Sequence, residues 1–183
     1  MINNKKQLKK VLENEKEIYK LSFFSVLGGF LFISERGVIW RYQRNLRIWE
    51  YHTNCNHKFR SMLYRIRTVR LGLKTGFRIA PNCIDTGLRI MHIGSILINS
   101  NTRIGKNCTL HINTSFVATN GDSSAPIIGD NCKFGVGCCL IGPISLKNNV
   151  VVGAGAVVNK TFDEDHITIA GVPARIVSKK AIL

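Results

Sequence analysis

His92 is the residue of this sequence with the clearest capacity for chemistry. Imidazole titrates near pH 6.5, so a neutral histidine can take the proton of a hydroxyl group while that oxygen attacks an electrophile. Asp85 is the nearest preceding carboxylate and could fix the tautomer of His92, as carboxylates do in catalytic dyads. His111 lies 19 residues after His92 and could orient a reactant, stabilise charge or be a surface histidine. The alternative interpretation is that His92 is a structural residue that begins a repeat.

A repeat of six residues must position these side chains. Large apolar residues recur at every sixth position from Ile98 to Val158, and the phase survives a doubled interval between Phe116 and Ile128. A second column is small or β-branched, and we interpret its cysteines as small hydrophobes. They are Cys108, Cys132 and Cys138. Glycine, asparagine and aspartate between the columns tolerate turn geometry. Neither a helix nor a hairpin keeps a period of six, whereas a solenoid of short strands does.

The repeat divides the chain into three expected segments. Residues 1–75 form a basic, aromatic-rich helical segment, with helices over 3–20 and 35–71. Residues 76–165 form a parallel β-helix, which makes the fold mainly β, and residues 166–183 form a tail that packs on the last coils. Residues 117–127 replace one hexad with a polar loop, and such loops commonly lie on a binding face.

Positive charge is concentrated before residue 79. The first 78 residues hold 17 Lys and Arg against 5 Asp and Glu, a surplus of 12. Such a segment suits an anionic membrane surface, an acidic substrate or nucleic acid, of which we do not expect nucleic acid. Residues 23–33 are apolar, but they are shorter than the roughly 20 residues of a membrane span. We interpret them as a buried helix in preference to an interfacial contact.

The cysteines show no CxxC or metal-ligand spacing, which fits a reducing cytoplasm. We therefore expect a cytoplasmic protein that could lie at the inner face of the membrane.

Two motifs flank the hexads and carry a family resemblance. I-A-P-N precedes G-L-R-I-M-H-I-G-S-I-L-I-N at residues 87–99, and A-G-V-P-A-R-I-V closes the pattern at residues 170–177. Over about residues 76–177 the chain resembles the hexapeptide-repeat acyltransferases, in particular the serine acetyltransferase-like branch that includes surface-polysaccharide O-acetyltransferases. The resemblance implies a left-handed β-helix and a homotrimer with active sites between subunits. It also implies acetyl-CoA as cosubstrate and His92 as the general base.

The resemblance also implies where acetyl-CoA binds. Backbone amides at glycine turns would hold the pantetheine, and cations would hold the phosphates. The matching residues are Gly135, Gly153, Ala154, Ala170, Gly171 and Arg175, with Lys180 as a further phosphate contact. The glycines also serve as corners of the coils. No metal is implied, because His52, His57 and His166 lie outside the regular coils.

Departures from the family bear on the acceptor. Serine acetyltransferases carry an aspartate directly before the catalytic histidine and a basic loop, where this chain has Met91 and Ser124–Ile127. The family's dyad aspartate lies roughly one coil earlier, where this chain has Phe77 and Arg78. We therefore favour a carbohydrate hydroxyl as acceptor, contacted by Met91 and by Asn120 and Asp122 of the loop. Acetylation of L-serine is the alternative, and a non-catalytic β-helix scaffold is the alternative of another class.

Overall fold

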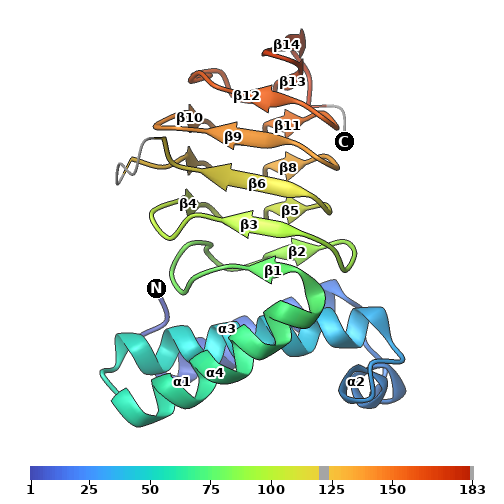
Figure 1. Ribbon diagram of the computed structural model, residues 1–183, viewed down its shortest axis with the longest axis vertical. Coiled ribbons are helices and arrows are strands. Elements are labelled where there is room, and N and C mark those ends of the chain that lie inside the picture. The colour runs from blue at the N-terminus through green and yellow to red at the C-terminus, as the bar shows by residue number, and fades with distance from the viewer. Residues whose placement is uncertain (120–123, 182–183) are drawn as a thin grey trace.

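Short parallel strands form a three-sided prism that stands on a layer of helices (Figure 1). The computed structural model describes residues 1–119 and 124–181. Within them, α1 (Lys5–Ile18), α2 (Phe23–Phe30), α3 (Glu35–Asn54) and α4 (Lys58–Thr75) precede the strands. The single helix expected over 35–71 is in fact two, α3 and α4. They are separated by a turn at residues 55–57 in which Asn56 takes a left-handed conformation with φ 56°.

Fourteen strands follow the helices in the described chain. They are β1 (Phe77–Arg78), β2 (Arg89–Ile90), β3 (Ile96–Ile98), β4 (Arg103–Ile104), β5 (Thr109–Leu110), β6 (Thr114–Val117), β7 (Ile127–Ile128), β8 (Lys133–Phe134), β9 (Cys139–Ile141), β10 (Ser145–Leu146), β11 (Val151–Val152), β12 (Val157–Val158), β13 (Thr168–Gly171) and β14 (Ala174–Ser178).

The strands form three sheets, one for each side of the prism. Their orders are β1-β3-β6-β9-β12, β10-β7-β4 and β14-β13-β11-β8-β5-β2. From β3 to β12 successive strands enter the three sheets in strict rotation, so each coil contributes one strand to each side. Paired strands are parallel except for the β13–β14 hairpin at the C-terminal end. The predicted left-handed parallel β-helix with an N-terminal helical segment is confirmed.

Asparagine and aspartate side chains build one corner of the prism. Asn107, Asn131 and Asn149 occupy successive coils with φ between 56° and 58°, a conformation that asparagine tolerates better than most residues. Beside them, Asp130 Oδ1 accepts the N–H of Lys106 at 2.7 Å, and Asn148 Oδ1 accepts the N–H of Asp130 at 2.8 Å. These residues form turns, as the sequence predicts, and their hydrogen bonds join each coil to the next.

The apolar columns fill the interior of the prism. Phe116 and Phe134 are fully buried, and their rings meet edge to face with centroids 4.9 Å apart. Cys108, Cys132 and Cys138 have no exposed surface, as expected of small hydrophobes in a stack. Each short strand buries its apolar side only because the neighbouring coils cover it, which makes the stack cooperative.

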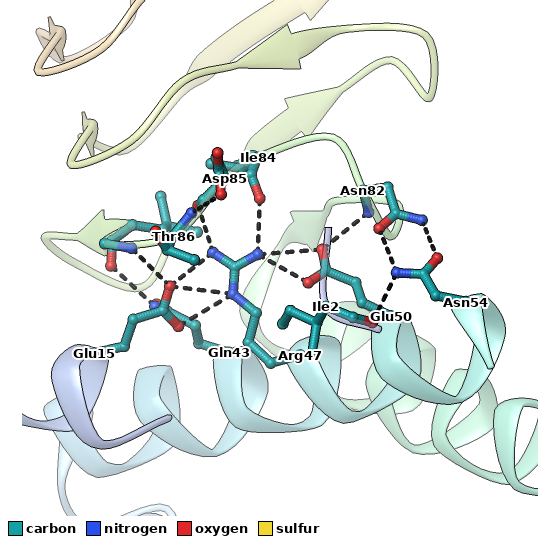
Figure 2. Close-up of polar contacts among 12 residues, drawn as sticks. Ile2, Glu15, Gln43, Arg47, Glu50, Asn54, Asn82, Ile84, Asp85 and Thr86 are labelled. Atoms are coloured by element: carbon teal, nitrogen blue, oxygen red, sulfur yellow. Dashed lines mark hydrogen bonds and ion pairs between the residues drawn. The ribbon is translucent and has the colours of Figure 1, made fainter. Parts of the chain in front are cut away.

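Arg47 of α3 connects the helical layer to the first coil (Figure 2). Its guanidinium donates to both carboxylate oxygens of Glu15 and of Glu50, with shortest distances of 2.7 and 2.9 Å. It also donates to the backbone carbonyls of Ile84 and Asp85, at 2.7 Å each. Burial alone would lower the pKa of Arg47, but the two carboxylates outweigh it and raise the pKa. The charge is therefore permanent, and the helices are fixed to the prism by a buried ionic cluster.

The segment of residues 23–33 lies on the surface, so its interpretation as a buried helix is wrong. Phe23 and Phe24 of α2 are 77% and 80% exposed, and Ile33 is 80% exposed. Another side of α2 packs against α3 at Gly29, and its Val26 contacts the core. In the described chain no helix could cross a membrane by itself, although α2 and α3, bent by 76°, together satisfy the length and composition for one.

Candidate active site

His92 lies in the turn between β2 and β3, with 59% of its side chain exposed. Two buried side chains of the helical layer hold the strand that leads to it. The hydroxyl of Tyr19 accepts the N–H of Ile90 at 2.9 Å, and Gln43 Nε2 donates to the carbonyl of Leu88 at 2.9 Å. Tyr19 in turn donates to Gln43 Oε1 at 2.8 Å. The position of His92 therefore depends on the helices as well as on the coil.

Glu35 supplies a carboxylate to His92. Its Oε2 lies 3.4 Å from Nδ1 of His92, and its Oε1 accepts the N–H of Ile93 at 2.9 Å. Glu35 is the first residue of α3, whose N-cap Ser34 accepts the N–H of Gly37, and a helix N-terminus favours negative charge. A carboxylate at Nδ1 favours the tautomer with its proton on that nitrogen, which leaves Nε2 free to act as a base.

The carboxylate expected at His92 was Asp85, and the structure does not bring the two together. Asp85 Oδ1 accepts the N–H of Thr86 at 2.7 Å, and its backbone carbonyl accepts from Arg47. The side chain is therefore engaged in a local turn at the base of the prism (Figure 2). Glu35 precedes His92 by 57 residues, and neither motif nor spacing relates them. The one sequence signal was Ser34-Glu35, a helix N-cap followed by an acidic first turn.

His111 lies on the coil above His92, as the stacking of the hexads predicts. Ile90 pairs with Leu110, and the N–H of Met91 donates to the carbonyl of Leu110 at 3.0 Å, so His111 lies beside Met91. The pKa of His111 is lowered by burial, and further by its proximity to His92 and Arg89. Two imidazoles thus share this edge, and His111 favours its neutral form.

The predicted cofactor residues continue the same edge toward the C-terminus. The strand registers place Gly135, Gly153 and Ala170 in line above His111. A Cβ on Gly135 would lie 2.6 Å from the backbone N of Ala154, so close stacking of the coils requires glycine there. The N–H groups of Gly135 and Gly153 already donate to Val152 and Ile169, each at 2.8 Å. Their amides are therefore not free for a ligand, although the edge offers a smooth strip of small residues.

The β13–β14 hairpin places the remaining predicted residues at the end of this strip. Ala170 pairs with Arg175, and Gly171 with φ 97° pairs with Ala174. Arg175 and Lys180 are both exposed. Two cations therefore stand beyond the small-residue strip, which fits a long ligand with phosphates at one end.

The remaining predictions concern the acceptor and metals. Met91 is half-buried beside His92, whereas Asn120 and Asp122 lie outside the described residues. Among the residues that the structure describes, no group of three or more His, Cys, Asp and Glu could hold a metal ion. A large groove in the helical layer does not include His92, and the exposed His92 side chain lies at an open surface position of this chain.

Sequence comparisons agree with this architecture. A family described as "Hexapeptide repeat of succinyl-transferase" matches residues 127–160. The serine acetyltransferase of Staphylococcus xylosus is 32% identical over 108 residues, which are 57% of this chain and 50% of that protein. The chain is therefore similar to serine acetyltransferases over its hexapeptide repeats. It spans about half the length of the curated relatives that it matches.

Solved structures share the fold over nearly the whole chain. A serine acetyltransferase of Brucella abortus in complex with coenzyme A superimposes with a TM-score of 0.72 at 19% identity, covering 96% of this chain and 70% of that one. The enzyme of Neisseria gonorrhoeae in complex with serine gives a TM-score of 0.70 at 22% identity, covering 95% and 70%. The helical layer is therefore part of the shared fold.

Proposed function

We propose that the protein is an acetyl-CoA-dependent acetyltransferase of the serine acetyltransferase type, with His92 as its general base. The observation that carries this proposal is the carboxylate of Glu35 at Nδ1 of an exposed histidine. A histidine that only stabilised the coil would need no carboxylate partner across two structural layers. The similarity to serine acetyltransferases supports the same reaction class.

The residues present can perform the transfer directly from acetyl-CoA to the acceptor, without an acyl-enzyme. Nε2 of neutral His92 accepts the proton of the acceptor hydroxyl while that oxygen attacks the thioester carbonyl carbon. The bond from carbon to sulfur then breaks, and the imidazolium returns the proton to the departing coenzyme A thiolate. Glu35 stabilises the imidazolium between these two proton transfers. The products are an acetyl ester and coenzyme A, and no other reactant is needed.

Acetyl-CoA fits the strip of small residues above His111. Gly135, Gly153 and Ala154 present little side chain to a pantetheine, and Arg175 and Lys180 would meet the phosphates. Because the ladder uses the Gly135 and Gly153 amides, the pantetheine would bind by shape and through other backbone groups. A protein with this fold was solved in complex with coenzyme A, which supports the choice of ligand.

L-Serine is the first acceptor to test. The relatives are serine acetyltransferases, and one structure with this fold contains serine. This chain has Met91 where serine acetyltransferases carry an aspartate before the catalytic histidine. Glu35 now supplies a carboxylate at the same histidine, which could meet an ammonium group.

A carbohydrate hydroxyl is the second candidate, and Met91 is the observation that favours it. Met91 places a neutral, half-buried side chain directly before His92. Such a side chain contributes nothing to binding a zwitterion but can lie against the apolar face of a sugar ring. Recognition of a small zwitterion depends on charged partners, whose loss costs much of the discrimination.

A homotrimer is part of this proposal. His92 is 59% exposed on the prism edge, so the chain by itself provides only one wall for a reacting thioester. Three flat-sided prisms packed around a three-fold axis would supply the second wall and exclude water.

The test is mass spectrometry of purified protein with acetyl-CoA and either L-serine or a panel of oligosaccharides. We expect acetyl ester and free coenzyme A with one acceptor class, at a kcat/KM of about 10⁴ M⁻¹s⁻¹ or more. Efficient O-acetylserine formation would exclude the carbohydrate candidate. Absence of coenzyme A binding and of thioester cleavage would leave a non-catalytic scaffold and refute the proposal.

A further inference from the structure

The helical layer contains a large groove outside the candidate active site. It has a volume of about 1300 Å³ and lies between α1, α2, α3 and α4. Its apolar lining includes Val26, Phe30, Trp40 and Leu71. Among the described residues that line it, eight are lysine or arginine and one, Glu13, is acidic. The groove therefore combines an apolar lining with a strongly cationic one.

The apolar side chains of α2 and of the turn after it extend this groove onto the surface. The set comprises Phe23 (77% exposed), Phe24 (80%), Leu27 (49%), Phe30 (55%), Leu31 (64%), Phe32 (45%) and Ile33 (80%). Single exposed apolar residues are ordinary, but a contiguous patch of this kind marks an interaction site. No acidic residue interrupts it between Leu21 and Ser34.

The orientation of α2 is fixed by a close helix crossing. A Cβ on Gly29 would lie 2.3 Å from the carbonyl carbon of Gly37 in α3, and a Cβ on Gly37 would lie 2.0 Å from the carbonyl oxygen of Ser25. The two backbones touch at these glycines, so α2 cannot turn its phenylalanines inward without separating from α3. Exposure of the apolar patch is therefore built into the fold.

A second apolar stripe runs along α4. Met62, Ile66, Val69 and Leu73 recur at helical spacing and are 62%, 41%, 48% and 83% exposed. At 100° per residue, Arg65 lies on one flank of this stripe and Arg70 and Lys74 lie on the other. Leu73, Arg70 and Lys74 also line the groove, so the stripe and the groove form one continuous surface.

Cations and aromatic rings alternate over this surface. The guanidinium of Arg41 lies 4.8 Å from the ring centre of Phe30, and the ammonium of Lys74 lies 5.0 Å from that of Phe32. Apolar side chains flanked by lysine and arginine are characteristic of helices that lie in the headgroup region of anionic bilayers. Each such cation near an anionic bilayer strengthens the attraction of the protein to that bilayer.

We infer that the surface formed by α2, α4 and the groove between the helices docks the protein on an anionic lipid bilayer. The charge distribution disfavours a second copy of the chain as the partner that covers this surface. Glu15 and Glu50, two of the five acidic residues before residue 79, are buried against Arg47, so two copies would oppose their cations almost without carboxylates. Nucleic acid would satisfy the cations but would leave the apolar patch of α2 exposed to water.

The docking surface is close in sequence to a residue of the candidate active site. Ile33 belongs to the patch, and Glu35, two residues later, contacts His92. Docking would thus bring the acceptor site close to the headgroups, where a lipid-linked hydroxyl could reach it. This consequence for the acceptor rests on the proposed acetyl transfer, whereas docking itself does not.

The experiment is co-sedimentation of the full chain with vesicles of phosphatidylcholine, alone or mixed with phosphatidylglycerol, in the absence of acetyl-CoA. We expect binding to the mixed vesicles at least about tenfold stronger than to the neutral ones, and weaker as salt increases. The double variant Phe23→Ser/Phe24→Ser should bind these vesicles at least about tenfold more weakly than the parent, because it removes apolar area that enters the bilayer. The matched variant Val136→Ser/Val177→Ser, at exposed positions of the prism, should bind as the parent does.

A second pair of variants tests the charges. Arg65→Gln/Arg70→Gln should reduce the preference for anionic vesicles and its salt dependence, whereas Lys106→Gln/Lys147→Gln on the prism should not. Equal binding to neutral and anionic vesicles, or no binding, would overturn the inference. So would a Phe23→Ser/Phe24→Ser variant that loses a self-associated state in light scattering but keeps its vesicle binding, because the patch would then be a contact between copies. Vesicle binding without any acetyl transfer would sustain docking while refuting the proposed function.

Discussion

The pairing of His92 with Glu35 joins the first residue of α3 to a turn of the first coil. The sequence predicts the histidine as the base because its surrounding motif is local. It could not identify the carboxylate, because the pair forms only when the helical layer packs against the prism. Asp85 is the nearest preceding carboxylate in sequence, but closeness in sequence does not place its side chain against His92 in the coil.

Replacing Glu35 by glutamine tests this pair. The amide oxygen can still accept the N–H of Ile93, but the negative charge beside Nδ1 is lost. We expect kcat for acetyl transfer to fall about tenfold or more, less than the roughly 10⁴-fold cost of a buried triad carboxylate, because this pair is half exposed. Glu17→Gln, at another exposed carboxylate of the helical layer, should leave kcat unchanged. Unchanged kcat in Glu35→Gln with normal coenzyme A binding would remove Glu35 from the site.

His111 provides a pH-dependent prediction. Burial, His92 and Arg89 all lower its pKa, so the folded state holds the imidazole neutral at a pH where the unfolded chain already binds a proton. Its contribution to stability is therefore full above the unfolded value of about 6.5 and falls as the pH drops below it. NMR titration should give a pKa for His111 below 6.5, and Arg89→Met should raise it, whereas Arg78→Met should not. A pKa for His111 at or above the ordinary value would contradict this.

The elements differ in how far the sequence determined them. The hexad columns predicted the strands and their stacking, because each column corresponds to one inward-facing position on every side of the prism. The break between α3 and α4 was missed, since only the left-handed Asn56 marks it. The exposure of α2 was also missed, because apolar composition by itself does not distinguish a buried helix from an interfacial one.

The Arg47 cluster should dominate the stability of the junction between helices and prism. Arg47→Met would leave two buried carboxylates without a counter-charge, and breaking such a cluster costs about 3–5 kcal/mol of unfolding free energy. Urea denaturation measures the loss, and Arg44→Met, at an exposed position of the same helix, should change stability by no more than about 0.5 kcal/mol. Equal midpoints for the two variants would show that the cluster does not stabilise the junction.

We propose that a neighbouring subunit completes the candidate active site. An exposed His92 and a strip of small residues form one wall, and a homotrimer would provide the other. Light scattering at micromolar concentration should therefore give a mass of about three times the 20.5 kDa of the chain. A stable monomer with full activity would contradict the trimeric site and require a cleft within one chain.

The role proposed for His92 is that of the general base in an acetyl transfer from acetyl-CoA. Its most direct test compares the parent protein with His92→Ala, using the acceptor that gives the highest kcat/KM and measuring coenzyme A affinity in parallel. We predict that kcat falls by roughly 10²- to 10⁴-fold, the usual contribution of a positioned general base, while coenzyme A affinity stays within error of the parent. Turnover close to that of the parent would show that His92 is only a structural residue of the first coil.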